Sequence, residues 1–358
     1  MEQVQETVVI NEARLNELLG KMVNEVGAAI NGALIIIGDK LSLYETLAKA
    51  GPLSSQELAD STGTYERYVR EWLAAQAASG FVKYDHLTNK FYMSAEQAMV
   101  FAEPESPVLM TGGFYSVSSM YHDEPKITHA FQTGNGVEWA DHNNCLFCGV
   151  EKFYGPSYRG NLITSWIPSL NGVEDKLKSG AIVADIGCGH GLATILMAEA
   201  FPHSQFTGYD FHEHSIVHAR EKAKELGLKN ISFEVASADS YPQKNFDLIT
   251  FFDALHDMGD PEGISAYALS ALAKDGTCMV VEPFAKDSLH ENLNPVARAF
   301  YASSALVCTP NALSQGKGIA IGAQAGRKKL TEVLTNGGFN EVRVAVETPF
   351  NLIFEAKK

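Results

Sequence analysis

The sequence predicts a mixed α/β protein in which a mainly helical N-terminal domain precedes a larger domain built on a parallel sheet. Three observations support this fold class. Strand-like and helix-like segments alternate from residue 181 onward, which is typical of a parallel sheet covered by helices. A glycine-rich stretch, residues 183–191, stands at the first strand-to-helix junction of that series. Three short helices and a hairpin are predicted before residue 110.

Length and composition fit a two-domain globular protein: 358 residues, 46% of them hydrophobic and 20% charged. Apolar runs such as residues 33–37 are far shorter than the roughly 20 residues of a membrane span, and the N-terminus lacks the basic start of a signal peptide. We therefore expect a cytoplasmic protein with no membrane partner. The net charge of −15 repels phosphate backbones, so nucleic acid is not an expected partner.

Residues 1–110 are predicted to form a winged-helix domain. They begin with an amphipathic helix over residues 11–31. Three short helices that end at glycines then follow, at residues 41–51, 54–63 and 64–80. Residues 81–94 alternate apolar and polar side chains around a turn, which predicts the two-stranded wing.

Side chains at the starts of these helices predict their caps. Ser54 or Ser55 is expected to cap the second short helix, and Thr64 the third. The third helix would be the DNA-reading one, yet Arg67 and Arg70 stand beside Glu66 and Glu71. Because the domain concentrates no positive charge, we expect it to mediate dimerisation; DNA binding remains the alternative.

Residues 111–180 form a connector rich in glycine, aromatic residues and histidine. Its pattern looks irregular and suits a lid over a bound substrate, although a helical bridge with packed aromatics is equally compatible. Within it, His142, Cys145 and Cys148 could supply half of a zinc site. No second half occurs in the chain, so we expect no metal.

Residues 181–358 are predicted to alternate strands and helices around one sheet. Expected strands cover residues 181–187, 205–210, 231–237, 246–255, 277–284 and two segments of 340–358 joined at Pro349. Expected helices cover residues 192–201, 214–227, 263–273 and 328–338.

The glycine-rich stretch distinguishes between cofactors. A dinucleotide-binding loop spaces its glycines as GxGxxG, which would require glycine at position 192, but Leu192 stands there. The observed GxGxG spacing resembles the S-adenosylmethionine loop of class I methyltransferases, whose fold also closes on a C-terminal hairpin. The resemblance implies a Rossmann-like, seven-stranded class I methyltransferase domain and assigns this part of the cofactor site to Asp185, Gly187, Cys188, Gly189 and Gly191.

Two further carboxylates follow the next strands in the order that such a site requires. Asp210 ends the second strand, where it can accept both ribose hydroxyls, and Asp239 follows the third strand, where it can accept from the adenine amino group. Each could instead be a turn or cap residue. The remaining residues expected at the cofactor are Phe211, packed on the adenine, and Ala238, Ser240, Phe252 and Asp253.

The segment FFDALHDMGDPEG after the fourth strand resembles small-molecule O-methyltransferases related to plant caffeate and isoflavone enzymes, which share a winged-helix dimerisation domain. The resemblance implies that His256 is the general base, with Glu282 orienting it and Asp257 beside it. Tryptophan follows the Asp in those enzymes, whereas Met258 stands here, which puts the role of His256 in doubt. His256 and Asp257 could instead cap the next helix.

The whole chain looks closest to a bacterial group of winged-helix methyltransferases that includes a mycobacterial relative. We expect a small, flat methyl acceptor in a pocket lined from the connector and from the segment before the last helix. The residues expected to line it are Trp139, Tyr154, Tyr158, Trp166, Tyr301 and Asn311. Ordinary packing under a lid would explain the same aromatics.

The sequence thus predicts a homodimeric, S-adenosylmethionine-dependent O-methyltransferase of a small molecule. Two alternatives stay open. The enzyme could methylate nitrogen or carbon without a base, or the chain could be a winged-helix transcriptional regulator that senses a metabolite.

Overall fold

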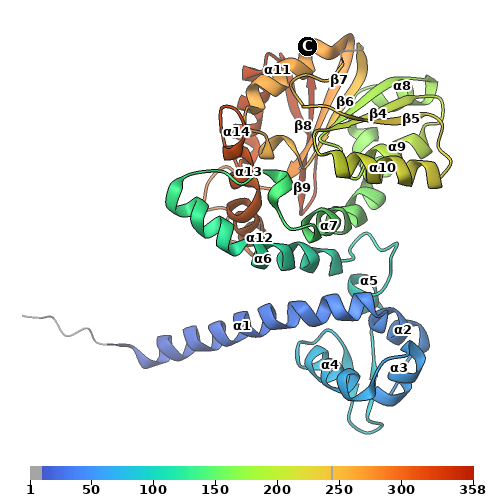
Figure 1. The fold of residues 1–358 in the computed structure, drawn as a ribbon, viewed down its shortest axis with the longest axis vertical. Helices are drawn as coiled ribbons and strands as arrows, with labels where there is room; N and C mark the ends of the chain where they lie inside the picture. The colour runs from blue at the N-terminus through green and yellow to red at the C-terminus, as the bar shows by residue number, and fades with distance from the viewer. Residues whose placement is uncertain (1–9, 243–244) are drawn as a thin grey trace, which may run out of the picture. The chain divides into compact units, whose positions relative to one another are not determined.

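The computed structural model describes residues 10–242 and 245–358 (Figure 1). They form two compact units. One ends at Pro104 and takes in Leu109–Phe114; the other consists of Glu105–Val108 and Tyr115–Lys358.

The N-terminal unit has the predicted three short helices and hairpin. Its elements are α1 (Glu12–Lys40), α2 (Leu43–Ala50), α3 (Ser55–Thr62), α4 (Glu66–Ala78), β1 (Lys83–Asp85), β2 (Lys90–Tyr92) and α5 (Ala95–Phe101). Buried side chains from these helices form one hydrophobic core, with Leu47, Leu58 and Leu73 fully inside it. The hairpin turns at Asn89, whose φ of 53° is a conformation that Asn tolerates.

The helix starts follow the predictions only in part. Ser54 caps α3 in a capping box with Glu57, as expected. The prediction that Thr64 caps α4 is wrong, because the N-cap residue is Tyr65, and the Thr64 hydroxyl pairs with that of Thr62 instead.

Helix α4 carries its two arginines in ion pairs on its own surface. Arg67 pairs with Glu71 at 2.5 Å and Arg70 with Glu66 at 2.7 Å. These pairs leave the exposed face of α4 without a surplus of positive charge.

Helix α1 is longer than the sequence pattern predicted and is mostly exposed. The side chains of its apolar stripe are exposed to solvent by 42–71%. They are Leu15, Leu18, Leu19, Met22, Val23, Val26 and Ile30. Among the described residues it is the one helix long and apolar enough to cross a membrane by length and composition. A single such helix also occurs in proteins that never enter a membrane, and the apolar residues of α1 follow the spacing of an amphipathic helix.

Near the end of α1, Gly38 allows two aromatic rings to approach the helix backbone. A Cβ at this position would lie 2.6 Å from Trp72 Cζ2 and 2.6 Å from Tyr44 Cε2. Both rings are buried and pack edge to face, so neither can withdraw easily. We expect Gly38→Ala to lower the free energy of unfolding by about 1–3 kcal/mol, measured by urea denaturation.

Gly27 provides the matched control on the same helix, because a Cβ there meets nothing within 4 Å. Gly27→Ala should raise stability by about 0.5–1 kcal/mol through helix propensity alone. Equal effects of the two substitutions would contradict the crowding at Gly38.

The connector is helical where the sequence pattern looked irregular. Its elements are α6 (Thr111–Thr133), η1 (Trp139–Asp141), α7 (Cys145–Asn161), the π-helical turn η2 (Leu162–Trp166), η3 (Ile167–Ser169) and α8 (Val173–Ser179). A Cβ at Gly149 would lie 2.5 Å from the backbone nitrogen of Ser116, so the glycine lets α7 lie directly against α6. Glycines that disfavour a helix locally thus serve the packing between helices.

The second unit is built on a seven-stranded sheet in the order β5-β4-β3-β6-β7-β9-β8. Its strands are β3 (Ile182–Ile186), β4 (Gln205–Asp210), β5 (Ile231–Val235), β6 (Phe246–Phe252), β7 (Leu272–Pro283), β8 (Glu341–Glu347) and β9 (Asn351–Lys357). All neighbouring pairs are parallel except those of β9, which runs antiparallel to β7 and β8. The α/β fold class and the closing hairpin predicted from the sequence are confirmed.

Helices cover both faces of this sheet, with α9 and α10 on the side opposite α11 and α14 (Figure 1). The elements between the strands are α9 (Leu192–Ala200), α10 (Glu213–Glu225), η4 (Leu255–Asp257), α11 (Pro261–Ala271), α12 (Pro295–Ser303), the π-helical turn η5 (Ser304–Cys308), α13 (Thr309–Ser314) and α14 (Gly326–Asn336). Because β3, β4 and β6 are parallel neighbours, the loops at their carboxyl ends meet at one edge.

Candidate functional site

The glycine loop joins β3 to α9 in a conformation that side chains disfavour. Gly187, Gly189 and Gly191 have φ of 71°, 52° and 78°. A Cβ at Gly191 would lie 2.5 Å from the Phe233 ring, whereas one at Gly189 would meet nothing within 4 Å. The glycine at 191 therefore serves packing, and the glycine at 189 leaves the loop backbone open to a ligand.

Asp210, the last residue of β4, holds this loop. One carboxylate oxygen accepts the N–H of Gly189 and the other accepts the N–H of His212, both at 2.8 Å. Burial raises the pKa of Asp210, and the two backbone donors oppose the rise. Each oxygen keeps a second lone pair for a ligand hydroxyl.

Asp185 turns its carboxylate inward, to Thr194 Oγ1 at 2.5 Å and Thr250 Oγ1 at 3.0 Å. Burial raises its pKa to about 6, against the effect of both hydroxyl donors. Asp185 thus connects β3, α9 and β6 beneath the loop, in addition to bordering the cavity.

A cavity of about 640 Å³ opens at this edge of the sheet. Most of the predicted cofactor residues line it: Asp185, Gly187, Cys188, Gly189, Asp210, Phe211, Ala238, Asp239, Phe252 and Asp253. Gly191 and Ser240 do not. A Cβ at Gly191 would point at the Phe233 ring. The Ser240 N–H donates to the carbonyl of Ser237 within a turn.

The predicted acceptor residues divide in the same way. Trp139, Tyr154, Tyr158 and Asn311 line the cavity, whereas Trp166 and Tyr301 do not. Trp166 is fully buried and packs edge to face against Tyr158 with ring centroids 5.8 Å apart, so it supports the wall from behind. Asn292 donates to the Tyr301 hydroxyl at 3.4 Å.

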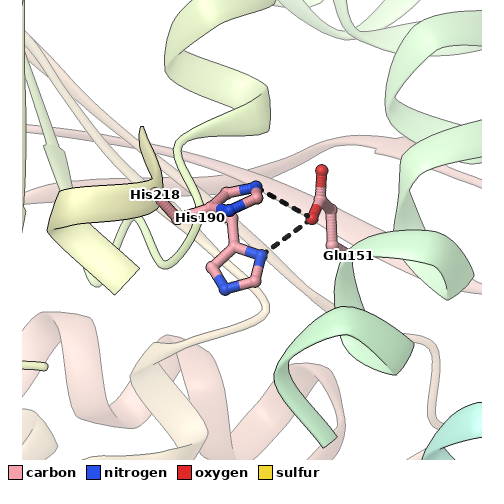
Figure 2. A group of neighbouring side chains, drawn as sticks. All are labelled: Glu151, His190 and His218. Carbon is pink, nitrogen blue, oxygen red and sulfur yellow. Dashed lines mark hydrogen bonds and ion pairs between the residues drawn. The ribbon is translucent and has the colours of Figure 1, made fainter. Parts of the chain in front are cut away.

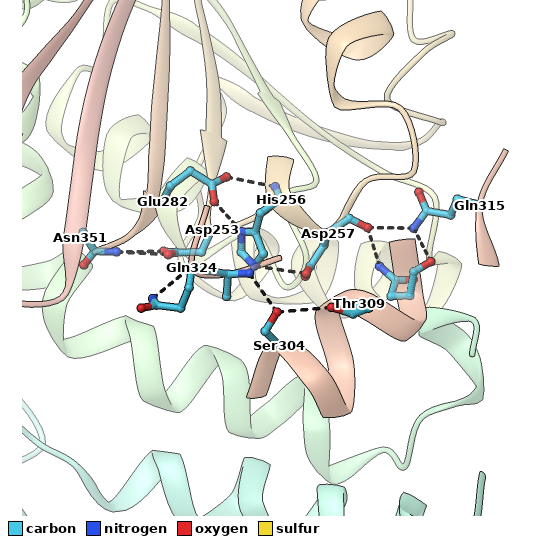
Figure 3. A network of polar contacts seen from close by, with 11 residues as sticks. Asp253, His256, Asp257, Glu282, Ser304, Thr309, Gln315, Gln324 and Asn351 are labelled. Carbon is cyan, nitrogen blue, oxygen red and sulfur yellow. Dashed lines mark hydrogen bonds and ion pairs between the residues drawn. The ribbon is translucent and has the colours of Figure 1, made fainter. Parts of the chain in front are cut away.

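The predicted catalytic group is part of a network of polar side chains (Figure 3). His256 is 2% exposed; its Nδ1 lies 2.5 Å from Glu282 and its Nε2 lies 3.2 Å from Asp257. Only Asp257 of these three residues lines the cavity. Burial favours neutral His256, but the Glu282 and Asp257 charges outweigh it and hold the pKa well above its ordinary value.

His256 and Asp257 do not cap the helix that follows them, α11. Asp260 caps α11 by accepting the N–H of Gly263 at 3.1 Å. The carbonyl of Asp257 instead accepts from Asn311 and Gln315, which fixes the turn from the other side.

Gly259, which follows Met258, lies closely against Gln315. Gly259 donates its N–H to the Gln315 side chain, and a Cβ at this position would lie 2.5 Å from the Gln315 carbonyl. The segment before α14 therefore approaches the turn too closely for a larger residue than glycine at 259.

Asp253 is a second carboxylate in the cavity wall. It has a left-handed φ of 48°, accepts from the Tyr158 hydroxyl at 2.7 Å and from Asn351 at 3.1 Å. Burial raises its pKa to about 8, against the Tyr158 hydrogen bond. Asp253 can therefore exchange a proton near neutral pH.

The structure adds a cluster that sequence reasoning missed. Glu151 from α7 meets His190 of the glycine loop and His218 of α10 (Figure 2). His190 stands between two predicted glycines, but Glu151 and His218 are distant in sequence and carried no signal. Among the described residues, His142, Cys145 and Cys148 do not come close enough to one another to form the suggested half of a zinc site. The His142 ring pairs with the Asp123 carboxylate instead.

Comparisons with known proteins agree with this architecture. Residues 177–338 match the family model described as Methyltransferase domain, and residues 28–103 match the Rv2258c-like winged HTH domain. The ubiquinone biosynthesis O-methyltransferase of Idiomarina loihiensis is 35% identical over 101 residues, which span 27% of this chain and 40% of that protein. The match therefore spans less than half of that relative's length.

Two solved structures show the same fold over the full length. Human N-acetylserotonin methyltransferase, solved in complex with S-adenosylmethionine, has a TM-score of 0.67 at 16% identity and covers 100% of this chain and 99% of its own. An O-methyltransferase family protein from Burkholderia thailandensis has a TM-score of 0.66 at 13% identity, covering 98% and 99%. At these identities the likeness shows the fold.

Proposed function

We infer that this chain, in which an Rv2258c-like winged-helix domain precedes a class I methyltransferase domain, is an S-adenosylmethionine-dependent enzyme that methylates a small molecule. The observation that carries this proposal is the glycine loop anchored by Asp210 beside a cavity large enough for a cofactor and an acceptor.

The donors around the loop fit S-adenosylmethionine. Open space above Gly189 admits a ligand to the loop backbone, and Asp210 has lone pairs for ribose hydroxyls. Asp239 and Phe211, both exposed in the cavity wall, suit the amino group and the face of an adenine. When bound, the cofactor supplies a methyl group activated on a sulfonium.

A flat, partly aromatic acceptor fits the other end of the cavity. Trp139, Tyr154 and Tyr158 supply apolar faces, and Asn311 and Asp257 supply polar contacts. The protein's task is to hold the acceptor atom in line with the methyl group and, for a hydroxyl, to remove its proton.

For O-methylation we assign this proton to His256, with Asp257 as the group that faces the acceptor. His256 is too buried to touch the acceptor directly, so the proton would pass through Asp257, which lines the cavity 3.2 Å from Nε2. Glu282 and Asp257 stabilise the imidazolium and hold the pKa of His256 above its ordinary value, which favours the protonated form. A base in this position gains its active form as pH rises.

Turnover with a phenolic acceptor is therefore expected to increase with pH across the alkaline range. His256→Asn should remove this increase and lower kcat about 10²- to 10⁴-fold, the usual contribution of general base catalysis, while leaving the Kd for S-adenosylhomocysteine unchanged. Transfer of label from S-adenosylmethionine to a panel of phenols and amines would identify the acceptor and supply this assay.

Asp253→Asn is the matched variant, since Asp253 also lines the cavity and burial raises its pKa to about 8. Unchanged turnover in His256→Asn would remove His256 from the mechanism. Turnover could instead rise with pH around a midpoint near pH 8 in His256→Asn and lose this rise in Asp253→Asn. That result would make Asp253 the base. Label transferred to amines alone would favour N-methylation.

We also propose that the chain is a homodimer in the cytoplasm. The exposed apolar stripe of α1 is a surface that a second copy would cover. The five cysteines are all free thiols, as a reducing compartment requires. Pairing of Arg67 and Arg70 with glutamates gives no support to a DNA-reading role.

A further inference from the structure

The Glu151, His190 and His218 side chains converge from three separate elements at the rim of the cofactor cavity (Figure 2). His190 Nδ1 lies 2.8 Å from Glu151 Oε2, and His218 Nε2 lies 3.9 Å from the same oxygen. The two imidazole rings are 4.2 Å apart and tilted by 33°. All three candidate ligand atoms lie within 4.8 Å of one another.

These distances suit a single metal ion. Zinc binds His nitrogen and carboxylate oxygen at about 2.0–2.2 Å, so tetrahedral ligand atoms lie about 3.3 Å apart. The observed 2.8 and 3.9 Å from the Glu151 oxygen to the two imidazole nitrogens bracket that spacing. Two histidines and one carboxylate leave a fourth position for water, as in open zinc sites.

The cluster holds one carboxylate and two imidazoles, each of which can donate a lone pair to a metal ion. Glu151 and His190 are partly buried, with side chains 34% and 11% exposed, so the cluster is shielded from solvent on one side. Lys222 is the cation that lies close enough to affect Glu151, and Cys148 lies on the same helix, α7. Neither is one of the three clustered ligands.

We propose that Glu151, His190 and His218 bind a divalent transition metal ion, zinc by the chemistry of the ligands, at the rim of the cofactor cavity. This goes beyond the proposed methyl transfer and does not depend on it. Because His190 belongs to the glycine loop and Glu151 to α7, the ion links the cofactor loop to the helix that forms the acceptor wall.

Calorimetric titration of Zn²⁺ into the tag-free, EDTA-treated full-length protein tests the site. We expect one ion per chain, with affinity reduced at least about 100-fold in His218→Ala, because even loss of an outer-shell partner costs about 10- to 100-fold. His218 is 48% exposed and lies outside the cavity lining, so this variant should fold. Glu151→Gln, which preserves shape, should weaken binding similarly.

His214→Ala is the matched control, because His214 is an exposed histidine on the same helix, α10, outside the cluster. It should leave Zn²⁺ affinity unchanged. Equal affinity in wild type and His218→Ala would overturn the proposal. So would binding that is lost only in Cys145→Ser plus Cys148→Ser, which would place the ion at the cysteine pair.

A spectroscopic readout separates ligation from a general loss of structure. Co²⁺ bound by two imidazoles and a carboxylate should show the visible bands of a four-coordinate ion in wild type and His214→Ala. Their absence in wild type would also overturn the proposal. Neither measurement uses methyl transfer, so failure of the proposed activity would leave it standing.

Discussion

Gly189→Arg is expected to weaken S-adenosylhomocysteine binding by at least about 100-fold in calorimetry. Two effects add. An L-residue at the left-handed φ of 52° is strained by about 1–3 kcal/mol, and each 1.4 kcal/mol is a tenfold change in affinity. The new side chain would also extend into the open space of the cavity where the ligand must approach the backbone.

Gly227→Arg controls for the backbone effect. Gly227 also has a positive φ, 70°, and a Cβ there meets nothing within 4 Å, but it lies outside the cavity lining. This variant should bind S-adenosylhomocysteine like the parent protein. Asp210→Ala should weaken binding too, because it removes both the ribose acceptor and the anchor of the Gly189 N–H. Parental affinity in Gly189→Arg and Asp210→Ala would disprove the loop assignment.

Glu282→Ala is expected to lower the free energy of unfolding by about 3–5 kcal/mol, the usual cost of removing one partner from a buried ion pair. Glu282 is 1% exposed, and its carboxylate binds both the Nδ1 and the backbone N–H of His256. Denaturant unfolding at several pH values would measure the loss.

The pH dependence follows from the raised pKa of His256. When the pKa of a group is higher in the folded protein than in the unfolded chain, protonation of that group stabilises the fold. This stabilisation is complete below the unfolded pKa, which is about 6.5 for histidine. It is lost as the pH rises through the folded pKa. The loss of unfolding free energy in Glu282→Ala should therefore be largest near pH 6 and smaller at alkaline pH. A deficit independent of pH would indicate that lost packing dominates.

Glu355→Ala is a suitable control, since Glu355 is also a buried carboxylate in the same sheet. Its partners Arg343 and Lys357 are 42% and 28% exposed, so water can solvate the cations left behind. The loss should be smaller than for Glu282→Ala. The double variant His256→Ala with Glu282→Ala should lose less than the sum of the two single variants, because both single variants break the same His256–Glu282 pair.

The cofactor half of the candidate site was largely predictable because it is local in sequence. Gly187, Gly189 and Asp210 are defined by strand ends and a loop of fixed spacing, and the parallel order of β3 and β4 brings them together. Gly191 and Ser240 satisfied the same spacing but face other groups. Spacing places a residue near the site, and it cannot say which way that residue faces.

The acceptor half depended on contacts between distant segments. Trp139 and Tyr158 line the cavity, whereas Trp166, from the same aromatic run, is buried behind Tyr158. No periodicity distinguishes these positions, because the connector is a series of helices broken by η1, η2 and η3. Whether His256 meets the acceptor directly or through Asp257 is likewise a matter of burial, which the LHD segment alone does not reveal.

The sequence by itself determined the fold class, the winged-helix domain, the closing hairpin and the GxGxG loop that indicates the methyl donor, since these rest on short-range periodicity, turn chemistry and spacing. Only the tertiary structure decided that Asp210 anchors the loop backbone, that His256 is held between two carboxylates behind the cavity wall, and that Glu151, His190 and His218 meet. The physical reason is that burial and desolvation set which of these groups carries a charge, and both depend on packing between elements far apart in the chain.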